Sequence, residues 1–456
     1  MNDGIPRSTM FVLLCTFVVL LAGTDLLATL EAYPLYAGWA SVDITPEKPV
    51  NLVGQMSKRI SKSVLDPLTA TALALETKDQ NGAKEQAIMI SCDLLWTRKA
   101  VQEKLQLLVK PLIPDFDVSK LFLNATHTHT GPGVLDGAFY GLYDVSKDEG
   151  VMKASEYGNF LLERLCKLAV QAWQNRKPAA VSWALGHSVV GHNRRAHYFD
   201  GKAAMYGATS GENFSNIEGY EDHGQEMLFF WDEDRKLTGI LINVACPAQE
   251  TEGMHDISAD FWHDVREEIR RRHSKNVFVF PQCAAAGDQS PHLLWRKRAE
   301  DIMQQRKGIS RRQEIAHRIA DAVDGVFEYA RKNIKNKVIF VHTLAQIDLP
   351  TREPPDLPFC TCDSVKPAEI RVIRLADVAL ATNPFELYLD YGIRTKARSK
   401  AVLTFIVQLA CQYSGYLPTE RAIKGGGYSA VKYVVGPQGG QVLVNETVKL
   451  INAMWD

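Results

Sequence analysis

Hydrophobic and polar positions divide the chain into apolar runs of strand length and longer segments with helical periodicity. The short runs are apolar almost throughout, which is typical of strands buried in a sheet. In the longer segments, apolar residues return every three to four positions, as one buried helix face requires. The pattern predicts strands at 38–46, 65–76, 87–95, 120–124, 179–186, 226–231, 237–244, 276–281, 370–380 and 402–409. It predicts helices at 99–110, 155–176, 261–273, 311–332, 384–399 and 440–455.

This alternation of strands and helices predicts an α/β fold, with a large mixed, mostly parallel sheet flanked by helices. Residues 33–456 are interpreted as one large domain. The polar, glycine-rich region 191–224 is long for a structureless connection, so we expect a binding loop or a lid there. Residues 350–367 hold five prolines in 18 residues and are the one linker-like segment. No internal repeat is visible in the sequence.

The N-terminus differs from the rest of the chain. Arg7 precedes an uncharged, strongly apolar run of 17 residues from Ser8 to Thr24. This length is short for a membrane-spanning helix and fits the core of a signal peptide. Residues 1–32 are therefore predicted to be a signal peptide, and the mature protein to be exported to the periplasm or secreted. An uncleaved N-terminal membrane anchor is the alternative.

Composition describes an ordinary globular protein, with 46% hydrophobic and 23% charged residues. The net charge is −1, which argues against nucleic acid as a partner. Outside the leader the seven cysteines lie at irregular spacings, several of them in apolar runs. We therefore expect buried thiols rather than a disulfide framework. Cys360 and Cys362 are interpreted as part of a simple loop, with a metal chelate or a local pair as alternatives.

The segment Leu121–Gly133 holds the first candidate chemistry. An apolar run leads into His127 and His129, and a Gly-Pro-Gly turn follows. Alternate residues of an extended chain face the same side, so both imidazoles should project together from the end of a strand. Histidine is the commonest metal ligand and carries protons near neutral pH. A pair of satisfied core or surface histidines is the alternative.

A second candidate is the turn Gly287–Pro291, which follows a buried strand and three alanines. Small residues let the backbone approach a substrate, and Ser290 on this turn would be exposed to attack a carbonyl. Its base would be His127, His129 or His292. Further candidates are polar groups at strand ends or in glycine-rich loops, each of which also has an ordinary structural role open to it: Asp93, Arg194, Glu386, Tyr416 and Tyr428.

Together these pieces resemble the N-terminal catalytic domain of the neutral/alkaline non-lysosomal ceramidase family. The motifs appear in family order from about Gly38 to the end of the chain, and Thr-His-Thr-His-x-Gly-Pro with Gly-Asp-x-Ser-Pro is the most specific combination. They are Val42–Pro46, Ser91–Asp93, Thr126–Pro132, Asn193–Arg194, Ile257–Asp260, Gly287–Pro291, Asn383–Glu386, Gly415–Thr419 and Gly427–Tyr428.

The resemblance implies a zinc-dependent amidase that cleaves the N-acyl bond of ceramide. It implies that His127, Glu386 and Tyr416 are zinc ligands and that Ser290 is the nucleophile. It places His129, Arg194 and Tyr428 around the reacting centre, and Asp288 of the serine motif is counted with them as a catalytic candidate. A small amphiphilic or acylated substrate and a peripheral contact with a membrane are expected.

The sequence also departs from the family pattern. A zinc-binding histidine is expected in the segment Asn243–Gln249, where this chain has Pro247. Cys246, Gln249 or His255 could replace it, although none is in register. The region after Pro350 leaves no room for the family's C-terminal β-sandwich, so a single catalytic domain is expected. A hydrolase of this fold acting on another ester or glycan-derived substrate, and a binding protein that has lost its metal, are the alternative functions.

Overall fold

The computed structural model describes residues 30–137, 141–352, 362–363 and 365–456. The chain divides into two units, Met1–Glu31 and Ala32–Asp456, and only the second is described below. The predicted signal peptide and most of the proline-rich segment lie outside the described residues. Within the described part of the chain, no helix is both long and apolar enough to cross a membrane.

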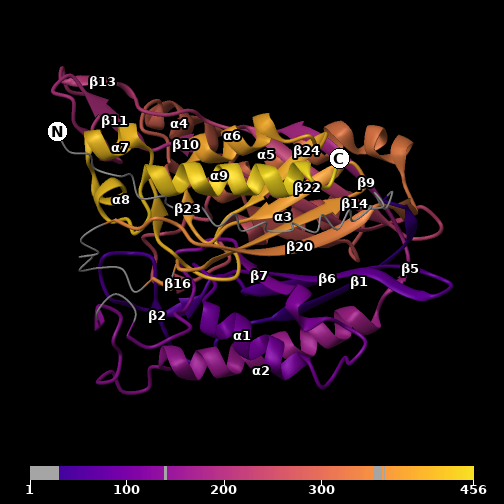
Figure 1. Ribbon diagram of the computed structural model, residues 1–456. Coiled ribbons are helices and arrows are strands. Elements are labelled where there is room, and N and C mark those ends of the chain that lie inside the picture. Colours follow the sequence, from indigo (N-terminus) through magenta and orange to yellow (C-terminus); the bar gives the residue numbers. More distant parts are fainter. Residues whose placement is uncertain (1–29, 138–140, 353–361, 364) are drawn as a thin grey trace, which may run out of the picture. The chain divides into compact units, whose positions relative to one another are not determined.

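Three four-stranded units, each part of its own sheet, build the fold (Figure 1). The first sheet contains β1 (Tyr33–Asp43), β5 (Thr69–Asp79), β6 (Gly82–Cys92) and β7 (Leu121–Ala125). The second contains β9 (Ala180–His187), β14 (Gly224–Trp231), β15 (Leu237–Val244) and β17 (Phe278–Cys283). The third contains β20 (Phe340–Ile347), β21 (Ala368–Leu375), β22 (Val378–Thr382) and β24 (Leu403–Val407).

The same connection pattern occurs in all three sheets. The first three strands are antiparallel neighbours, and a helix then leads to a fourth strand that is parallel to the third. These connecting helices are α1 (Lys99–Val109), α3 (Phe261–Arg272) and α6 (Leu389–Arg398). A long helix follows each fourth strand: α2 (Ala154–Gln174), α5 (Arg311–Ala330) and α9 (Pro437–Asn452). The topology is thus repeated three times, although no repeat is visible in the sequence.

The predicted α/β class is confirmed, but the sheets are mixed rather than mostly parallel. Of the nine pairings within the three units, six are antiparallel and three are parallel. The apolar runs suggested parallel strands because such strands are usually buried on both faces. Here antiparallel strands are also buried on both faces. In β14, for example, Phe229 packs toward the helices and Phe230 toward the other sheets.

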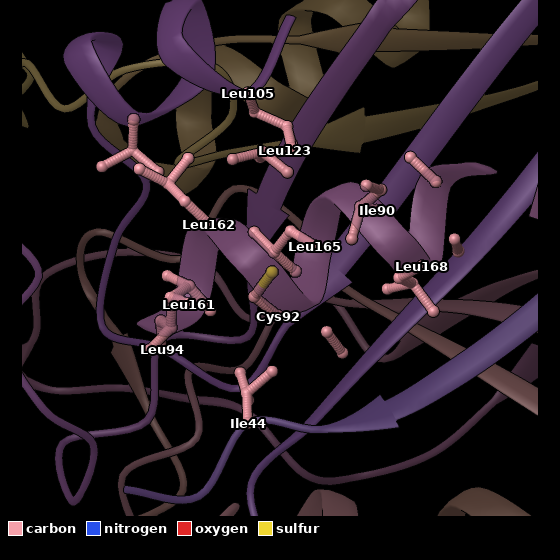
Figure 2. Close-up of a cluster of buried hydrophobic side chains, with 14 of the residues drawn as sticks. Ile44, Ile90, Cys92, Leu94, Leu105, Leu123, Leu161, Leu162, Leu165 and Leu168 are labelled. Carbon is pink, nitrogen blue, oxygen red and sulfur yellow. The ribbon is translucent and has the colours of Figure 1, made fainter. Parts of the chain in front are cut away.

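Each sheet has helices on its outer face, and the inner faces of all three share one core. Figure 2 shows part of the outer layer of the first sheet, where Leu105 of α1 and Leu165 of α2 pack near Ile90 of β6 and Leu123 of β7. The shared inner core includes aromatic and aliphatic side chains from all three sheets: Trp39, Phe122, Phe230, Phe280, Leu380 and Phe405. As a result, the ends of strands from all three sheets lie around one region.

The remaining α-helices and strands are short or belong to connections. They are β2 (Asn51–Leu52), β3 (Arg59–Ile60), β4 (Ser63–Val64), β8 (Lys177–Pro178), β10 (His192–Asn193), β11 (Arg195–Tyr198), β12 (Ala203–Met205), β13 (Phe214–Ile217), β16 (Asp256–Ile257), β18 (Gln289–Ser290), α4 (Lys297–Lys307), β19 (Lys337–Val338), β23 (Glu386–Leu387), β25 (Tyr416–Leu417), α7 (Glu420–Gly425) and α8 (Tyr428–Val431). The predicted loop at 191–224 contains a small sheet in the order β12-β11-β13.

The expected buried thiols are confirmed for most of the described cysteines. Cys92, Cys246, Cys283 and Cys411 are free and buried, and Cys166 is free and partly buried. Cys362 differs because it is disulfide-bonded. Its disulfide bond differs from the interpretation of Cys360 and Cys362 as part of a simple loop without bonded cysteines, and Cys360 itself lies outside the described residues.

Candidate active site

One cavity of about 350 Å³ collects most of the candidate side chains. Its walls come from segments that follow the carboxyl ends of strands in each of the three sheets, which is where α/β folds commonly bind ligands. Of the residues proposed from the sequence, six line it: His127, His129, Arg194, Glu386, Tyr416 and Tyr428. The cavity also has an apolar part, formed by Met56, Leu95 and Trp96.

The backbone fixes His127 at the base of the cavity in one orientation. His127 follows β7 and has a φ of 66°. Its imidazole Nδ1 lies 2.6 Å from the carbonyl oxygen of Leu95. A carbonyl can only accept, so Nδ1 donates this hydrogen bond and Nε2 is the ring nitrogen that faces the cavity. This Nε2 lies 3.4 Å from Oε2 of Glu386 and 3.5 Å from Nε2 of His129. The imidazole is therefore oriented as a metal-binding histidine would be.

Glu386 faces His127 from the third sheet. It begins β23, which runs parallel to β25 and pairs Glu386 with Tyr416. Tyr413 donates a hydrogen bond of 3.1 Å to its Oε1. Burial raises the pKa of the Glu386 carboxyl, but His127, Tyr416 and Arg194 outweigh this and hold it below the ordinary value. The carboxylate is thus kept charged inside the protein.

His129 is held as a neutral imidazole beside His127. Burial, together with His127 and Arg194, lowers its pKa well below the usual value. Its Nε2 lies 2.6 Å from the side-chain nitrogen of Gln249. Gly54, with a φ of 109°, makes room for the ring, because a β-carbon there would lie 2.6 Å from Nδ1. A neutral histidine can accept a proton from a reacting group.

Arg194 supplies a buried positive charge at the edge of the cavity and is 1% exposed. Its Nη1 donates to the hydroxyl of Tyr206 at 2.9 Å and to Oε1 of Gln249 at 3.2 Å, and its Nη2 donates to the carbonyl oxygen of Gly287 at 3.0 Å. Its Nε has no hydrogen-bond partner. A fixed guanidinium of this kind could stabilise negative charge that develops on a substrate oxygen.

Ser290 and Asp288 lie next to the cavity but do not line it. Ser290 is 0% exposed, so the expectation of an exposed hydroxyl on this turn is wrong. On the cavity side Ser290 contacts Tyr206, whose hydroxyl donates to Oγ of Ser290 at 3.2 Å and whose ring lines the cavity. Asp288 accepts hydrogen bonds from the backbone N–H of Leu389 and from the side chain of Asn193, both at 2.9 Å. These contacts position the backbone around Ser290.

A second set of ionisable groups lies on the far side of Ser290, around His292. The backbone N–H of His292 donates to Oγ of Ser290 at 3.1 Å. Its ring lies between two carboxylates, with Nδ1 3.4 Å from Glu250 and Nε2 3.3 Å from Glu252. Burial raises the pKa of Glu250 to about 7, although His292 acts in the opposite direction. The contacts with Glu252 and Glu250 outweigh burial and raise the pKa of His292.

The contribution of Glu250 to the stability of the protein should therefore decrease as the pH rises from about 4.5 to about 7. In this interval Glu250 binds a proton in the folded protein that it does not bind in the unfolded chain, so each increase in pH favours unfolding. The shift corresponds to about 3 kcal/mol at pH 7. Urea unfolding at pH 5 and pH 7.5 should show a smaller pH dependence for Glu250→Gln than for the wild type. An equal pH dependence in both proteins would contradict the assignment.

Several polar cavity residues were not singled out as site residues from the sequence, among them Tyr206, Gln249, Glu252 and Tyr413. Tyr206, Glu252 and Tyr413 belong to no motif and come from connections whose path is set by distant contacts. Gln249 was one of three alternatives for the missing histidine, and it is the one whose side chain lines the cavity. The thiol of Cys246 contacts the carbonyl oxygens of Val190 and Pro247, and His255 contacts the carbonyl oxygen of Ile60.

Three side chains that line the cavity are the candidates to hold a metal ion: His127, Glu386 and Tyr416. Among the described residues, no group of three or more His, Cys, Asp or Glu side chains is arranged to hold a metal ion. With a phenol as the third donor, His127 Nε2, Glu386 and Tyr416 supply nitrogen and oxygen ligands of the kinds that zinc accepts. The oriented imidazole of His127 and the charged state of Glu386 support this fit.

Comparison with known proteins identifies the fold. The chain is similar to neutral ceramidase from Pseudomonas aeruginosa, with a TM-score of 0.72, 17% sequence identity, and coverage of 92% of this chain and 75% of that chain. It is also similar to a ceramidase complexed with C2, with a TM-score of 0.71, 16% identity, and coverage of 93% and 75%. No family model and no curated protein matches the sequence. The resemblance found in the motifs is thus confirmed at the level of the fold.

Proposed function

We propose that this chain is a divergent member of the neutral ceramidase family and an exported, zinc-assisted hydrolase of an N-acyl amide bond. The observation that carries the proposal is the cavity itself. Six residues that the family resemblance assigns to the site, from separate segments of the chain, line one cavity on a ceramidase fold. A structural role for each of them separately would not explain why they meet.

The proposed reaction begins with attack of Ser290 Oγ on the carbonyl carbon of the amide. Arg194 and Tyr428 donate hydrogen bonds to the oxygen that becomes negative, and His129 accepts the hydroxyl proton of Ser290 and delivers it to the leaving amine. The C–N bond breaks, and water then hydrolyses the acyl-serine ester to release the acid. A zinc ion held by His127, Glu386 and Tyr416 would polarise the carbonyl and lower the pKa of the serine hydroxyl.

The apolar part of the cavity supports a substrate with an amphiphilic or acylated structure. Met56, which is 54% exposed, lies at the cavity together with Trp96 and Tyr413, whose rings stack with centroids 4.5 Å apart. Such surfaces suit an acyl chain next to a polar head. A peripheral contact with a membrane, from which such a substrate would be taken, is part of the proposal.

Metal analysis of the purified protein tests the zinc proposal directly. We expect about one zinc ion per chain, as in other single-metal catalytic sites, and loss of this zinc in His127→Ala. His255→Ala is the matched control, because this histidine does not line the cavity, and it should retain the metal. Zinc retained by His127→Ala would refute the assigned ligand. Absence of zinc from the wild type, with no turnover of a short-chain fluorescent ceramide or of simple acyl esters, would refute the enzyme.

Two observations favour a second function, that of a binding protein for acylated molecules. Pro247 offers no side-chain donor for a metal, and Ser290 is covered. Such a protein would bind a fluorescent ceramide saturably without cleaving it. A hydrolase of the same fold with another ester or glycan-derived substrate would bind zinc and cleave acyl esters but leave ceramide intact. The same set of assays therefore separates the three functions.

A further inference from the structure

We infer that Tyr206 is a gate between the cavity and Ser290, and that it must move before a substrate carbonyl can reach the serine. The inference rests on the proposed function in one respect, namely that Ser290 is the group to be reached. Tyr206 lies in the 191–224 region, for which the sequence predicted a binding loop or a lid. In the structure, the part of this region that lies between the cavity and Ser290 is the side chain of Tyr206.

The closed position of the gate is defined by two hydrogen bonds. The hydroxyl of Tyr206 accepts from Nη1 of Arg194 at 2.9 Å and donates to Oγ of Ser290 at 3.2 Å. The phenol therefore bridges the proposed nucleophile and the proposed oxyanion-binding cation. Ser290 is 0% exposed and does not line the cavity, whereas Tyr206 does. In this position a carbonyl group in the cavity meets the tyrosine and not the serine.

The backbone at Tyr206 is strained, which favours a second conformation. Its φ is 53°, a left-handed value that a bulky aromatic residue rarely adopts. A hydrogen bond of 2.7 Å from its N–H to the carbonyl oxygen of Arg194 holds it there. The next residue is Gly207, where a β-carbon would lie 2.3 Å from the hydroxyl of Tyr198. Strain of this kind gathers at functional and switching sites.

The tyrosine also has a direction in which to move. The residue is 36% exposed, although its hydroxyl contacts a fully buried serine. It directly follows β12, a strand of three residues that pairs with β11 alone. An outward rotation of the side chain would need no change in the three main sheets.

Opening would prepare two groups at once. Loss of the phenol frees Oγ of Ser290 from one donor and frees one hydrogen-bonding position on Arg194 Nη1, which keeps its contact with Gln249. A substrate carbonyl entering the vacated space would meet the nucleophile and the cation together. The gate thus links access to Ser290 with the availability of Arg194.

Thiol labelling at position 290 tests the gate without relying on catalysis. Ser290→Cys is combined with Tyr206 intact, with Tyr206→Phe and with Tyr206→Ala, and each full-length protein is treated with methyl methanethiosulfonate. Mass spectrometry of peptide fragments separates position 290 from Cys283, which is buried and serves as an internal control. Tyr198→Phe is the control on the same small sheet, because its hydroxyl donates a hydrogen bond to the carbonyl oxygen of Ala208 and not to Ser290 or Arg194.

We expect labelling at position 290 to be about tenfold faster or more in Tyr206→Phe, which loses the closing hydrogen bonds, and at least as fast in Tyr206→Ala. Faster labelling in Tyr206→Ala alone would support a gate closed by the ring. If both Tyr206 variants are labelled at position 290 at the same rate as the Ser290→Cys protein with Tyr206 intact, the inference is overturned. Hydrolysis by the corresponding Ser290 proteins is measured in parallel. Faster labelling in the Tyr206 variants, without hydrolysis by any Ser290 protein, would support the gate and refute the proposed function. Hydrolysis by the Ser290 proteins, with unchanged labelling rates in the Tyr206 variants, would support the proposed function and refute the gate.

Discussion

Replacement of Ser290 by alanine is expected to reduce amide hydrolysis by about 10³-fold or more, because the proposed reaction passes through an ester on this oxygen. The measurement is the single-turnover rate with a short-chain fluorescent ceramide, or with an acyl ester if ceramide is not cleaved. Zinc content should not change, because Ser290 is not among the proposed ligands. Loss of rate with metal retained would separate a nucleophile from a residue that only stabilises the site.

The matched control is Ser182→Ala. Ser182 is also buried, accepts one hydrogen bond of 2.9 Å from Trp231 Nε1, and lies on β9, away from the cavity lining. We expect hydrolysis by this variant to stay within about twofold of the wild type, since Ser182 does not line the cavity and its loss removes no group near the reacting atoms. Turnover that survives Ser290→Ala would contradict attack by the serine and would leave water as the attacking group.

Replacement of Asp93 by asparagine is expected to lower the free energy of unfolding by about 3–5 kcal/mol, because it leaves a buried guanidinium without its counter-charge. Asp93 is 0% exposed and accepts hydrogen bonds from Nη1 and Nη2 of Arg266 at 2.8 and 3.0 Å. It also accepts one from the backbone N–H of Thr69 at 2.8 Å. These contacts join the end of β6 to α3. Urea unfolding at pH 7 measures the loss.

Two further proteins make this result specific. The double variant Asp93→Leu with Arg266→Met removes both charges and should recover much of the lost stability. Glu163→Gln breaks the exposed pair with Lys167, whose side chains are 69% and 74% exposed, and should change stability by less than about 0.5 kcal/mol. If the free energy of unfolding of Asp93→Asn lies within about 1 kcal/mol of the wild-type value, a stabilising role for this ion pair is contradicted.

Asp93 also shows how far a sequence pattern can go. Its place after an apolar strand made it a candidate site residue, and the structure uses that place for an ion pair between a sheet and a helix. The helices at 99–110, 155–176 and 261–273 were predicted nearly to their ends, because one buried face gives a clear periodicity. The mixed, mainly antiparallel pairing of the sheets was not predicted, because burial on both faces produces the same apolar runs in antiparallel strands as in parallel ones.

The candidate site divides in the same way. His127, Glu386 and Tyr416 follow strands, and the ends of those strands meet, so their convergence could be expected from motifs and order alone. The burial of Ser290 could not. It depends on Tyr206, 84 residues earlier in the chain, and on the turn after β12 that brings the phenol over the serine. Contacts across such distances leave no local pattern in one sequence.

The threefold repetition of the topology has a consequence for how such a protein can diverge. Every sheet sends its loops to the same cavity, while the sheets themselves are fixed by helices outside and by a common core inside. Sequence change in a loop can therefore alter ligand selection without disturbing the framework, and change in the framework can be compensated within one of three units. This separation of tasks gives a physical reason why a chain sharing 17% of its residues with a bacterial ceramidase retains that enzyme's architecture over 92% of its length.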